Sequence, residues 1–221
     1  MRLKHVKGAE EFIAASPYTI EGEGTDGSLA GTWHARFGNA NPIFVEIGCG
    51  KGQFLLALAE QNPQINYIGI EKYSSVLIRA VQKRASEPYR ELSNIWFIRM
   101  DAEFIEEIFA PDEVSGIYLN FSDPWPKERH AKRRLTSHQF LARYEAFLKK
   151  DGEVVFKTDN ASLYAFSLEE IEAAGWELLS STDDLHADPV LCDGNVMTEY
   201  EEKFAGEGVP IHRYVARQKN E

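Results

Sequence analysis

From residue 42 onward, short apolar runs alternate with amphipathic helical patterns, and this alternation limits the possible folds more than any other feature. The strands it predicts are 42–47, 66–70, 95–98, 116–121, 153–156, 176–180 and 211–217. The helices it predicts are 53–61, 74–85, 102–109, 136–148 (opened by a capping box at Thr136) and 161–174. Strands separated by helices of this length form βαβ units with right-handed crossovers. The sequence therefore predicts an α/β fold: a doubly wound, mostly parallel, seven-stranded, Rossmann-like sheet with helices on both faces.

The first 41 residues lie outside this pattern. A short helix is predicted around residues 9–15, and the Gly-rich, acidic stretch 21–31 reads as a mobile loop. A chain of 221 residues is long enough for one sizeable α/β core. We expect a partly mobile N-terminal extension over 1–41 and a single domain over 42–221.

Composition excludes several classes of protein. No apolar run approaches the ~20 residues that span a bilayer, and the basic residues 1–7 run into Gly-Ala-Glu-Glu, unlike a secretory signal. Cys49 and Cys192 lie far apart without metal-ligand spacing. The expectation is a reduced, cytoplasmic protein with no membrane segment and no structural metal, as a monomer or a homodimer.

Charge is unevenly distributed along the chain. The net charge of −11 by itself disfavours binding to nucleic acid, but Lys127–Arg134 carries five positive charges against one negative charge. A polyanion approaching one face responds to this local field more than to the total charge. A solvated charge run is the plain alternative.

A glycine-rich turn follows the first predicted strand, in the segment Val45-Glu-Ile-Gly-Cys-Gly-Lys-Gly52. Gly48, Gly50 and Gly52 allow a tight turn and a close approach of a ligand to the backbone. Gln53 stands where the dinucleotide fingerprint requires glycine, which disfavours a nicotinamide cofactor. Taken alone, the turn is equally well explained as a tight connection between strand and helix.

Carboxylates at the next two strand ends add to this motif. Glu71 ends the second strand, 23 residues after Gly48, where a carboxylate accepts both hydroxyls of a ribose. Asp101 follows the third strand and is placed to meet an adenine amino group. Each acid alone is more simply a solvated strand end or a helix cap. Together with the glycine turn, they favour a cofactor that contains adenosine.

This combination resembles the class I S-adenosylmethionine-dependent methyltransferases, with 42–221 as the methyltransferase domain. The resemblance implies that Glu46 and the glycine turn hold the methionine moiety of S-adenosylmethionine. It implies further that Glu71 holds the ribose and that Asp101 meets the adenine edge.

A second motif follows the fourth predicted strand: Asn120-Phe-Ser-Asp-Pro-Trp-Pro-Lys127, which runs into the basic segment. Two prolines stiffen the loop, Asp123 supplies a carboxylate, and Trp125 offers an apolar face for a base. A rigid loop with a core tryptophan explains the same residues.

This second motif resembles the bacterial tRNA (guanine-N7-)-methyltransferase family, whose hallmark is an Asp-Pro-Trp loop leading into a Lys/Arg-rich segment. Lys157-Thr-Asp-Asn160 and Thr198-Glu-Tyr-Glu201 agree with the family, so the resemblance covers nearly the whole chain. It implies methyl transfer from S-adenosylmethionine to N7 of a guanine in tRNA, guanosine 46 of the variable loop, which forms 7-methylguanosine.

The resemblance also implies a role for each site residue. Asp123 would be the catalytic acid and would lie next to the cofactor. The guanine pocket would comprise Lys127, Asp159, Thr198, Glu199, Tyr200 and Glu201. The tRNA phosphates would contact Arg129, His130, Lys132, Arg133 and Arg134.

Three other functions remain open from the residues. A methyltransferase acting on an exocyclic base amine would use a similar loop, although its second proline is replaced here by Trp125. A non-catalytic RNA-binding protein with a relic fold is disfavoured by the intact acids Glu46, Glu71, Asp101 and Asp123. A nicotinamide dehydrogenase is disfavoured by Gln53.

Overall fold

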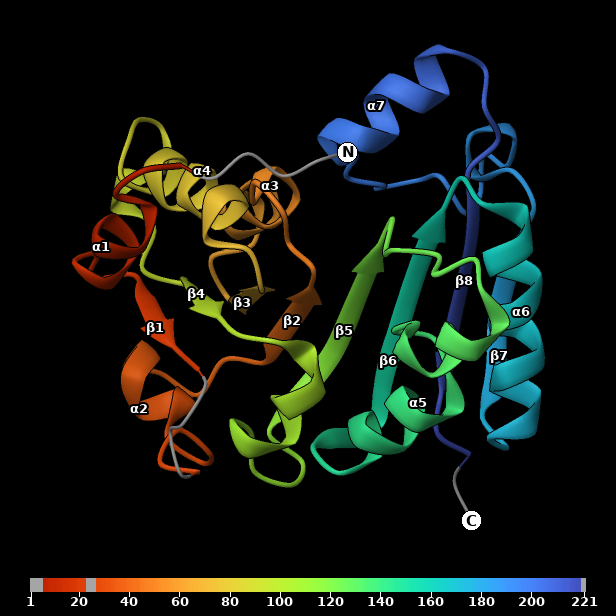
Figure 1. The fold of residues 1–221 in the computed structure, drawn as a ribbon, viewed down its shortest axis with the longest axis horizontal. Coiled ribbons are helices and arrows are strands. Elements are labelled where there is room, and N and C mark those ends of the chain that lie inside the picture. The colour runs from red at the N-terminus through yellow and green to blue at the C-terminus, as the bar shows by residue number, and fades with distance from the viewer. Residues whose placement is uncertain (1–5, 23–26, 220–221) are drawn as a thin grey trace. The chain divides into compact units, whose positions relative to one another are not determined.

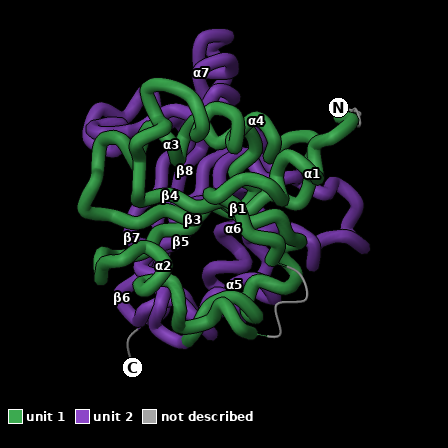
Figure 2. The backbone as a smooth tube through the Cα atoms, turned by 90° about the vertical axis from the view of Figure 1, so that its left-hand side faces the viewer, with its two compact units in different colours: residues 1–110 green, residues 111–221 purple. Residues whose placement is uncertain are grey.

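The structure is a computed structural model that describes residues 6–22 and 27–219 (Figure 1). Residues 1–5 of the predicted extension, and 23–26 of the predicted mobile loop, lie outside the described residues. The chain forms two compact units, residues 1–110 and residues 111–221 (Figure 2).

Unit 1 contains four parallel strands in the order β1-β4-β3-β2. They are β1 (Thr19–Glu21), β2 (Ile43–Ile47), β3 (Asn66–Glu71) and β4 (Ile95–Arg99). The helices are α1 (Ala9–Ala14), α2 (Trp33–Phe37), α3 (Gln53–Gln61) and α4 (Ser74–Arg84), with 3₁₀ turns η1 (Tyr89–Glu91) and η2 (Ala102–Glu107).

The central position of β3 explains its sequence. All six of its residues are buried, as expected for a parallel strand that is covered on both faces. Gly69 is needed there because a Cβ atom would lie 2.8 Å from the Phe97 ring and 2.9 Å from Cys49 Sγ. The absence of a side chain at Gly69 lets the turn after β2 pack closely against β3.

Unit 2 contains β5 (Val114–Asn120), β6 (Leu148–Thr158), β7 (Glu177–Thr182) and β8 (His212–Arg217). Strands β5 and β6 are parallel, whereas β8 runs antiparallel to both β6 and β7. The helices are α5 (His138–Glu145), α6 (Ala161–Ala173) and α7 (Glu199–Gly206), with 3₁₀ turns η3 (Glu128–Arg133) and η4 (Leu185–Ala187). Figure 1 shows α7 beyond the carboxyl end of β6, which is the edge where the predicted substrate residues fall.

Aromatic side chains fill the core of unit 2. The rings of Phe156 and Tyr214 lie 5.1 Å apart, and those of Tyr144 and Phe147 lie 6.2 Å apart. Burial raises the pKa of Tyr144 and the pKa of Tyr214, so both phenols stay neutral at physiological pH. These two tyrosines therefore add no charge to the core of unit 2.

All seven predicted strands are present, but the described residues contain an eighth, β1, so the predicted strand number was wrong. β1 extends the edge of the unit 1 sheet by pairing Thr19 with Phe97 of β4. Three residues are too few to show an alternating pattern, which is why this strand was missed.

The predicted helix 136–148 was wrong at both ends. Its N-cap is Ser137, without a side-chain capping bond, and Leu148 already belongs to β6. Thr136 does not cap the helix because its hydroxyl is buried and accepts a hydrogen bond from Ser167 Oγ at 2.7 Å. The predicted helix 102–109 forms the 3₁₀ turn η2 instead.

The described part of the N-terminal segment packs into unit 1. Trp33 is fully buried, and its indole N–H donates to the carbonyl of Ile108 at 2.7 Å. Its ring also contacts Phe37 and Phe109. The boundary at residue 41 stays a prediction. Across the described ranges, no helix has the length and apolar character needed to cross a membrane.

Candidate active site

The glycine turn of unit 1 joins the carboxyl end of β2 to α3. Gly48, Gly50 and Gly52 have positive φ values of 80°, 57° and 73°, which glycine adopts at no steric cost. The amide groups of Gly48 and Cys49 both donate to the carbonyl of Ile70 in β3, at 2.8 and 3.0 Å. The turn is therefore fixed by the neighbouring strand.

The three glycines serve two different purposes. A Cβ atom on Gly52 would lie 2.7 Å from Ala80 Cβ, so Gly52 is required for packing against α4. At Gly48 and Gly50, a Cβ atom would approach no described atom more closely than 4.0 Å. These two residues leave bare backbone beside open space, which is the surface that a ligand held close to the main chain requires.

Two buried carboxylates flank this turn. Glu71 Oε2 accepts a hydrogen bond from the amide of Gly50 at 3.2 Å, and Oε1 accepts one from the amide of Tyr73 at 2.9 Å. Glu46 is 2% exposed. Burial raises the pKa of the Cys49 thiol well above its ordinary value, and the charges of Glu46 and Glu71 raise it further. Both acids therefore lie near Cys49 in the turn, and their contact with a cofactor stays a prediction.

Asp101 lies at the carboxyl end of the adjacent strand, β4. The amide of Met100, next to it, donates to the carbonyl of Glu71 at 3.3 Å. The carboxylate of Asp101 caps η2 by accepting from the amide of Glu103 at 3.1 Å, and it forms an ion pair with Lys72. The carboxylate thus has a structural role as a cap, and its contact with an adenine stays a prediction.

In unit 2, the Asp-Pro-Trp loop follows the carboxyl end of β5. The amide of Phe121 donates to the carbonyl of Lys157 at 2.8 Å, which anchors the start of the loop to β6. Asp123 is exposed. Phe121 and Trp125, on either side of it, have φ values of 52° and 40°, a left-handed conformation that costs a residue with a side chain roughly 1–3 kcal/mol.

The basic segment continues from this loop as η3. Lys127 is its N-cap, and Lys127, Arg129, Lys132 and Arg133 are exposed. Within the segment, Arg129 Nε donates to His130 Nε2 at 3.4 Å, and Arg133 lies over the ring of Trp125 at 5.1 Å. These side chains form a cationic surface beside the loop of Asp123.

The residues predicted for the guanine pocket at the carboxyl end of β6 and the start of α7 meet at one edge of unit 2. The Tyr200 ring is 47% exposed and lies 5.1 Å from Phe121 and 4.4 Å from Phe204. Burial raises the pKa of Tyr200, and the charge of Asp159 raises it further. Asp159, Tyr200 and the start of the Asp-Pro-Trp loop are therefore neighbours.

Glu201 differs from its neighbours because its side chain is fully buried. Glu201 Oε2 forms an ion pair with Lys157 Nζ at 2.5 Å, and Lys157 is itself only 2% exposed. Glu201 Oε1 accepts from Asn195 Nδ2 at 2.7 Å and lies 3.2 Å from His186 Nε2. Both oxygens are therefore held by the chain itself, and a direct contact of Glu201 with substrate stays a prediction.

Known proteins match this chain over almost its full length. The family described as putative methyltransferase matches residues 40–214. The tRNA (guanine-N(7)-)-methyltransferase of Lachnoclostridium phytofermentans is 58% identical over 221 residues, which is 100% of both chains. That of Bacillus subtilis is 46% identical over 213 residues, covering 96% of this chain and 97% of the relative.

The chain belongs to the tRNA (guanine-N7-)-methyltransferase family. The solved structure of the 16S rRNA methyltransferase KamB is similar to it with a TM-score of 0.63 and 14% identity, covering 85% of this chain and 93% of that chain. At this identity the likeness concerns the fold alone. It confirms the predicted class, a mostly parallel α/β fold of the class I methyltransferases.

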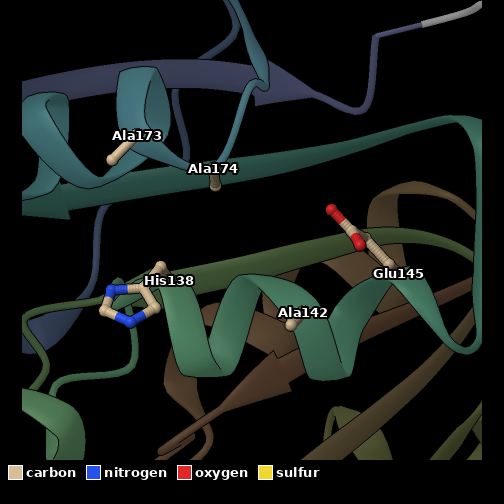
Figure 3. A pocket seen from close by; sticks show the side chains of 5 residues that line it. All are labelled: His138, Ala142, Glu145, Ala173 and Ala174. Carbon is tan, nitrogen blue, oxygen red and sulfur yellow. The ribbon is translucent and has the colours of Figure 1, made fainter.

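A cavity of unit 2 lies elsewhere. It has a volume of about 430 Å³ and lies between α5 and the C-terminal end of α6, lined by His138, Ala142, Glu145, Ala173 and Ala174 (Figure 3). Helix α6 begins directly after the carboxyl end of β6 and runs away from it for 13 residues. This cavity is therefore separate from the edge that carries the family's motifs.

Sequence reasoning missed the cluster that fixes the start of α7, in which the buried pair Lys157 and Glu201 contacts the half-buried Asn195 and the more exposed His186. One signal for it was present, because Thr198-x-x-Glu201 has the spacing of a capping box. Thr198 Oγ1 does accept from the amide of Glu201 at 2.9 Å. The glutamate then turns inward to Lys157, which no local pattern indicates.

The raised pKa of Cys49 predicts an unreactive thiol. Because the thiolate is the species that reacts with iodoacetamide, Cys49 in the folded protein should be alkylated far more slowly at pH 8 than the half-exposed Cys192. Its rate should still be rising with pH above 9, since the pKa is shifted upward. Peptide mass spectrometry measures both rates, and urea-unfolded protein is the control in which they should converge. Equal alkylation rates of the two cysteines in the folded protein would contradict the burial of Cys49 beside Glu46 and Glu71.

Proposed function

We propose that this chain transfers a methyl group from S-adenosylmethionine to N7 of guanosine 46 in the variable loop of tRNA, forming 7-methylguanosine. The observation that carries the proposal is the 58% identity, over the full length of both chains, to a tRNA (guanine-N(7)-)-methyltransferase. The proposal includes a cytoplasmic location, because that is where tRNA is found.

The residues of unit 1 fit the methyl donor. Bare backbone at Gly48 and Gly50 allows a close approach of its methionine moiety, with Glu46 beside it. Glu71 is held in place by two amide groups, and its carboxylate would accept the ribose hydroxyls. Asp101 would meet the adenine. When bound, S-adenosylmethionine supplies an electrophilic methyl group on a positively charged sulfur.

The acceptor atom sets what the protein must provide. Guanine N7 carries a lone pair and no proton, so the chain need not supply a general base to unmask it. The base becomes cationic as its lone pair forms the new bond to carbon. The protein must therefore align N7 with the methyl group and place negative potential around the purine. Alignment alone is worth roughly 7–11 kcal/mol.

The residues of unit 2 suit these two tasks. Asp123 and Asp159 are carboxylates at the carboxyl ends of β5 and β6, and they would stabilise the cationic base and select guanine through its N1 and N2 protons. Lys127, Thr198, Glu199 and Tyr200 would complete the guanine pocket. Glu201 contributes by fixing Lys157 and the first turn of α7, since both its oxygens are already engaged.

The basic segment suits the backbone of tRNA. The exposed cations Arg129, Lys132 and Arg133, together with His130, would contact phosphates outside the acidic pocket. This arrangement lets a protein with a net charge of −11 bind a polyanion through one cationic strip.

The reaction is tested directly with radiolabelled S-adenosylmethionine and unmodified tRNA. We expect label in 7-methylguanosine after nucleoside digestion, and chain cleavage at position 46 after reduction and aniline treatment. A tRNA with adenosine at position 46 is the control and should take up no label. Label on an exocyclic amine, or equal label in the control tRNA, would refute the assignment of the atom or of the position.

Substitution of Asp123 should lower turnover but leave cofactor binding nearly unchanged. We expect Asp123→Ala to lower kcat at least 100-fold, because negative potential at the reacting base is lost, while the Kd for S-adenosylhomocysteine changes less than about threefold. Asp151→Ala is the matched control, since Asp151 is exposed near the opposite end of β6. Single-turnover kinetics and calorimetry measure the two quantities. Near-normal turnover of Asp123→Ala would remove Asp123 from the catalytic role.

A further inference from the structure

The guanidinium of Arg134 points toward the Asp-Pro-Trp loop, unlike the exposed cations that precede it. Arg134 Nε donates to the carbonyl of Pro124 at 2.9 Å, and Nη2 donates to the carbonyl of Trp125 at 3.1 Å. Its guanidinium also stacks over the ring of Phe166 in α6, 4.2 Å from the ring centroid. The side chain is therefore fixed on three sides within unit 2.

The loop has a physical need for such a partner. Pro124 and Pro126 have no N–H group, so the loop cannot form a regular backbone ladder across this stretch. The carbonyls of residues 124 and 125 still require donors, and Arg134 supplies both.

The backbone strain of the loop also requires contacts that hold the loop in place. Phe121 and Trp125 both hold left-handed conformations, which persist only where the surroundings over-determine them. The amide of Phe121 is fixed to β6, and the carbonyl of Trp125 is fixed to Arg134. Asp123 lies between these two anchors, so its position depends on both.

The other cations of the segment lack this arrangement. Lys132 and Arg133 are exposed, and Arg133 lies over the Trp125 ring, 5.1 Å from its centroid. The basic segment therefore divides into outward cations, suited to phosphates, and one inward arginine.

We propose that Arg134 is a positioning residue that holds the Asp123 loop in its reactive conformation and is not a phosphate contact for tRNA. This inference rests on the proposed function for its kinetic consequence, whereas the clamp itself is a property of the folded chain. A planar guanidinium is suited to the role because its N–H donors lie on separate nitrogens and reach two carbonyls at once. A lysine has a single nitrogen, so all its donors start from one point.

The test compares Arg134→Lys and Arg134→Ala with Lys132→Ala. Both Arg134 variants should lower kcat at saturating tRNA by about 10- to 100-fold. They should leave the slope of log affinity for tRNA against log salt unchanged. Lys132→Ala should reduce that slope by about 0.7–0.9, which is the loss of one phosphate contact. Arg143→Ala, which removes a half-buried arginine on α5 outside the site, controls for loss of an arginine as such.

Hydrogen exchange supplies a readout that is independent of activity. The amides of the non-proline residues in 121–127 should exchange faster in both Arg134 variants, while the amides of α5 and α6 keep their protection. Wild-type kcat and loop protection in Arg134→Lys, or a lowered salt slope in Arg134→Ala, would overturn the proposal. If the wild-type protein makes no 7-methylguanosine, the proposed function fails, and the exchange measurement still decides whether the clamp exists.

Discussion

The proposed cofactor site of unit 1 depends on the hydrogen bonds that fix the turn after β2 to strand β3. One carbonyl, that of Ile70, accepts from two successive amides of the turn, and the carboxylate of Glu71 accepts from a third. Gly69 makes this possible by leaving room for Cys49 and Phe97 to approach β3. The same carboxylate that fixes the turn is proposed to bind the ribose. A rigid turn and a pre-oriented acid therefore arise from the same few contacts, which is the preorganisation that a binding site requires.

The proposed substrate residues of unit 2 depend on a different interaction, a buried ion pair. Taking Lys157 and Glu201 out of water costs several kcal/mol for each charge, and close pairing with further hydrogen bonds offsets this cost. Asn195 and the carbonyl of Val196 supply those additional bonds. The pair joins the end of β6 to the first turn of α7, so it fixes Tyr200 and its neighbours relative to Asp159. The ion pair contributes mainly by positioning α7, since an apolar pair of similar volume could stabilise the fold equally well.

The sequence predicted the architecture well because burial imposes long, regular patterns. The seven main strands and the positions of Glu46, Glu71, Asp101 and Asp123 at strand ends follow from such patterns. Features set by tertiary contacts could not be predicted. The three-residue strand β1 has no periodicity of its own. The direction of the Arg134 side chain depends on the carbonyls of Pro124 and Trp125, which accept its hydrogen bonds. Within a run of cations, no local pattern distinguishes Arg134 from Arg133. The inward turn of Glu201 depends on Lys157, 44 positions away.

The central claim is that the bare backbone of the glycine turn forms the cofactor site, and titration calorimetry with S-adenosylhomocysteine on Gly48→Ala tests it most directly. A methyl group at Gly48 would occupy the open space proposed for the ligand and should block it, and the backbone strain that it adds at a φ of 80° is matched in the control. Gly38→Ala is the matched control, because Gly38 has a similar positive φ of 72° and similar open space at the end of α2. The account predicts at least a 100-fold weaker Kd for Gly48→Ala and an unchanged Kd for Gly38→Ala. Wild-type affinity in Gly48→Ala would contradict it.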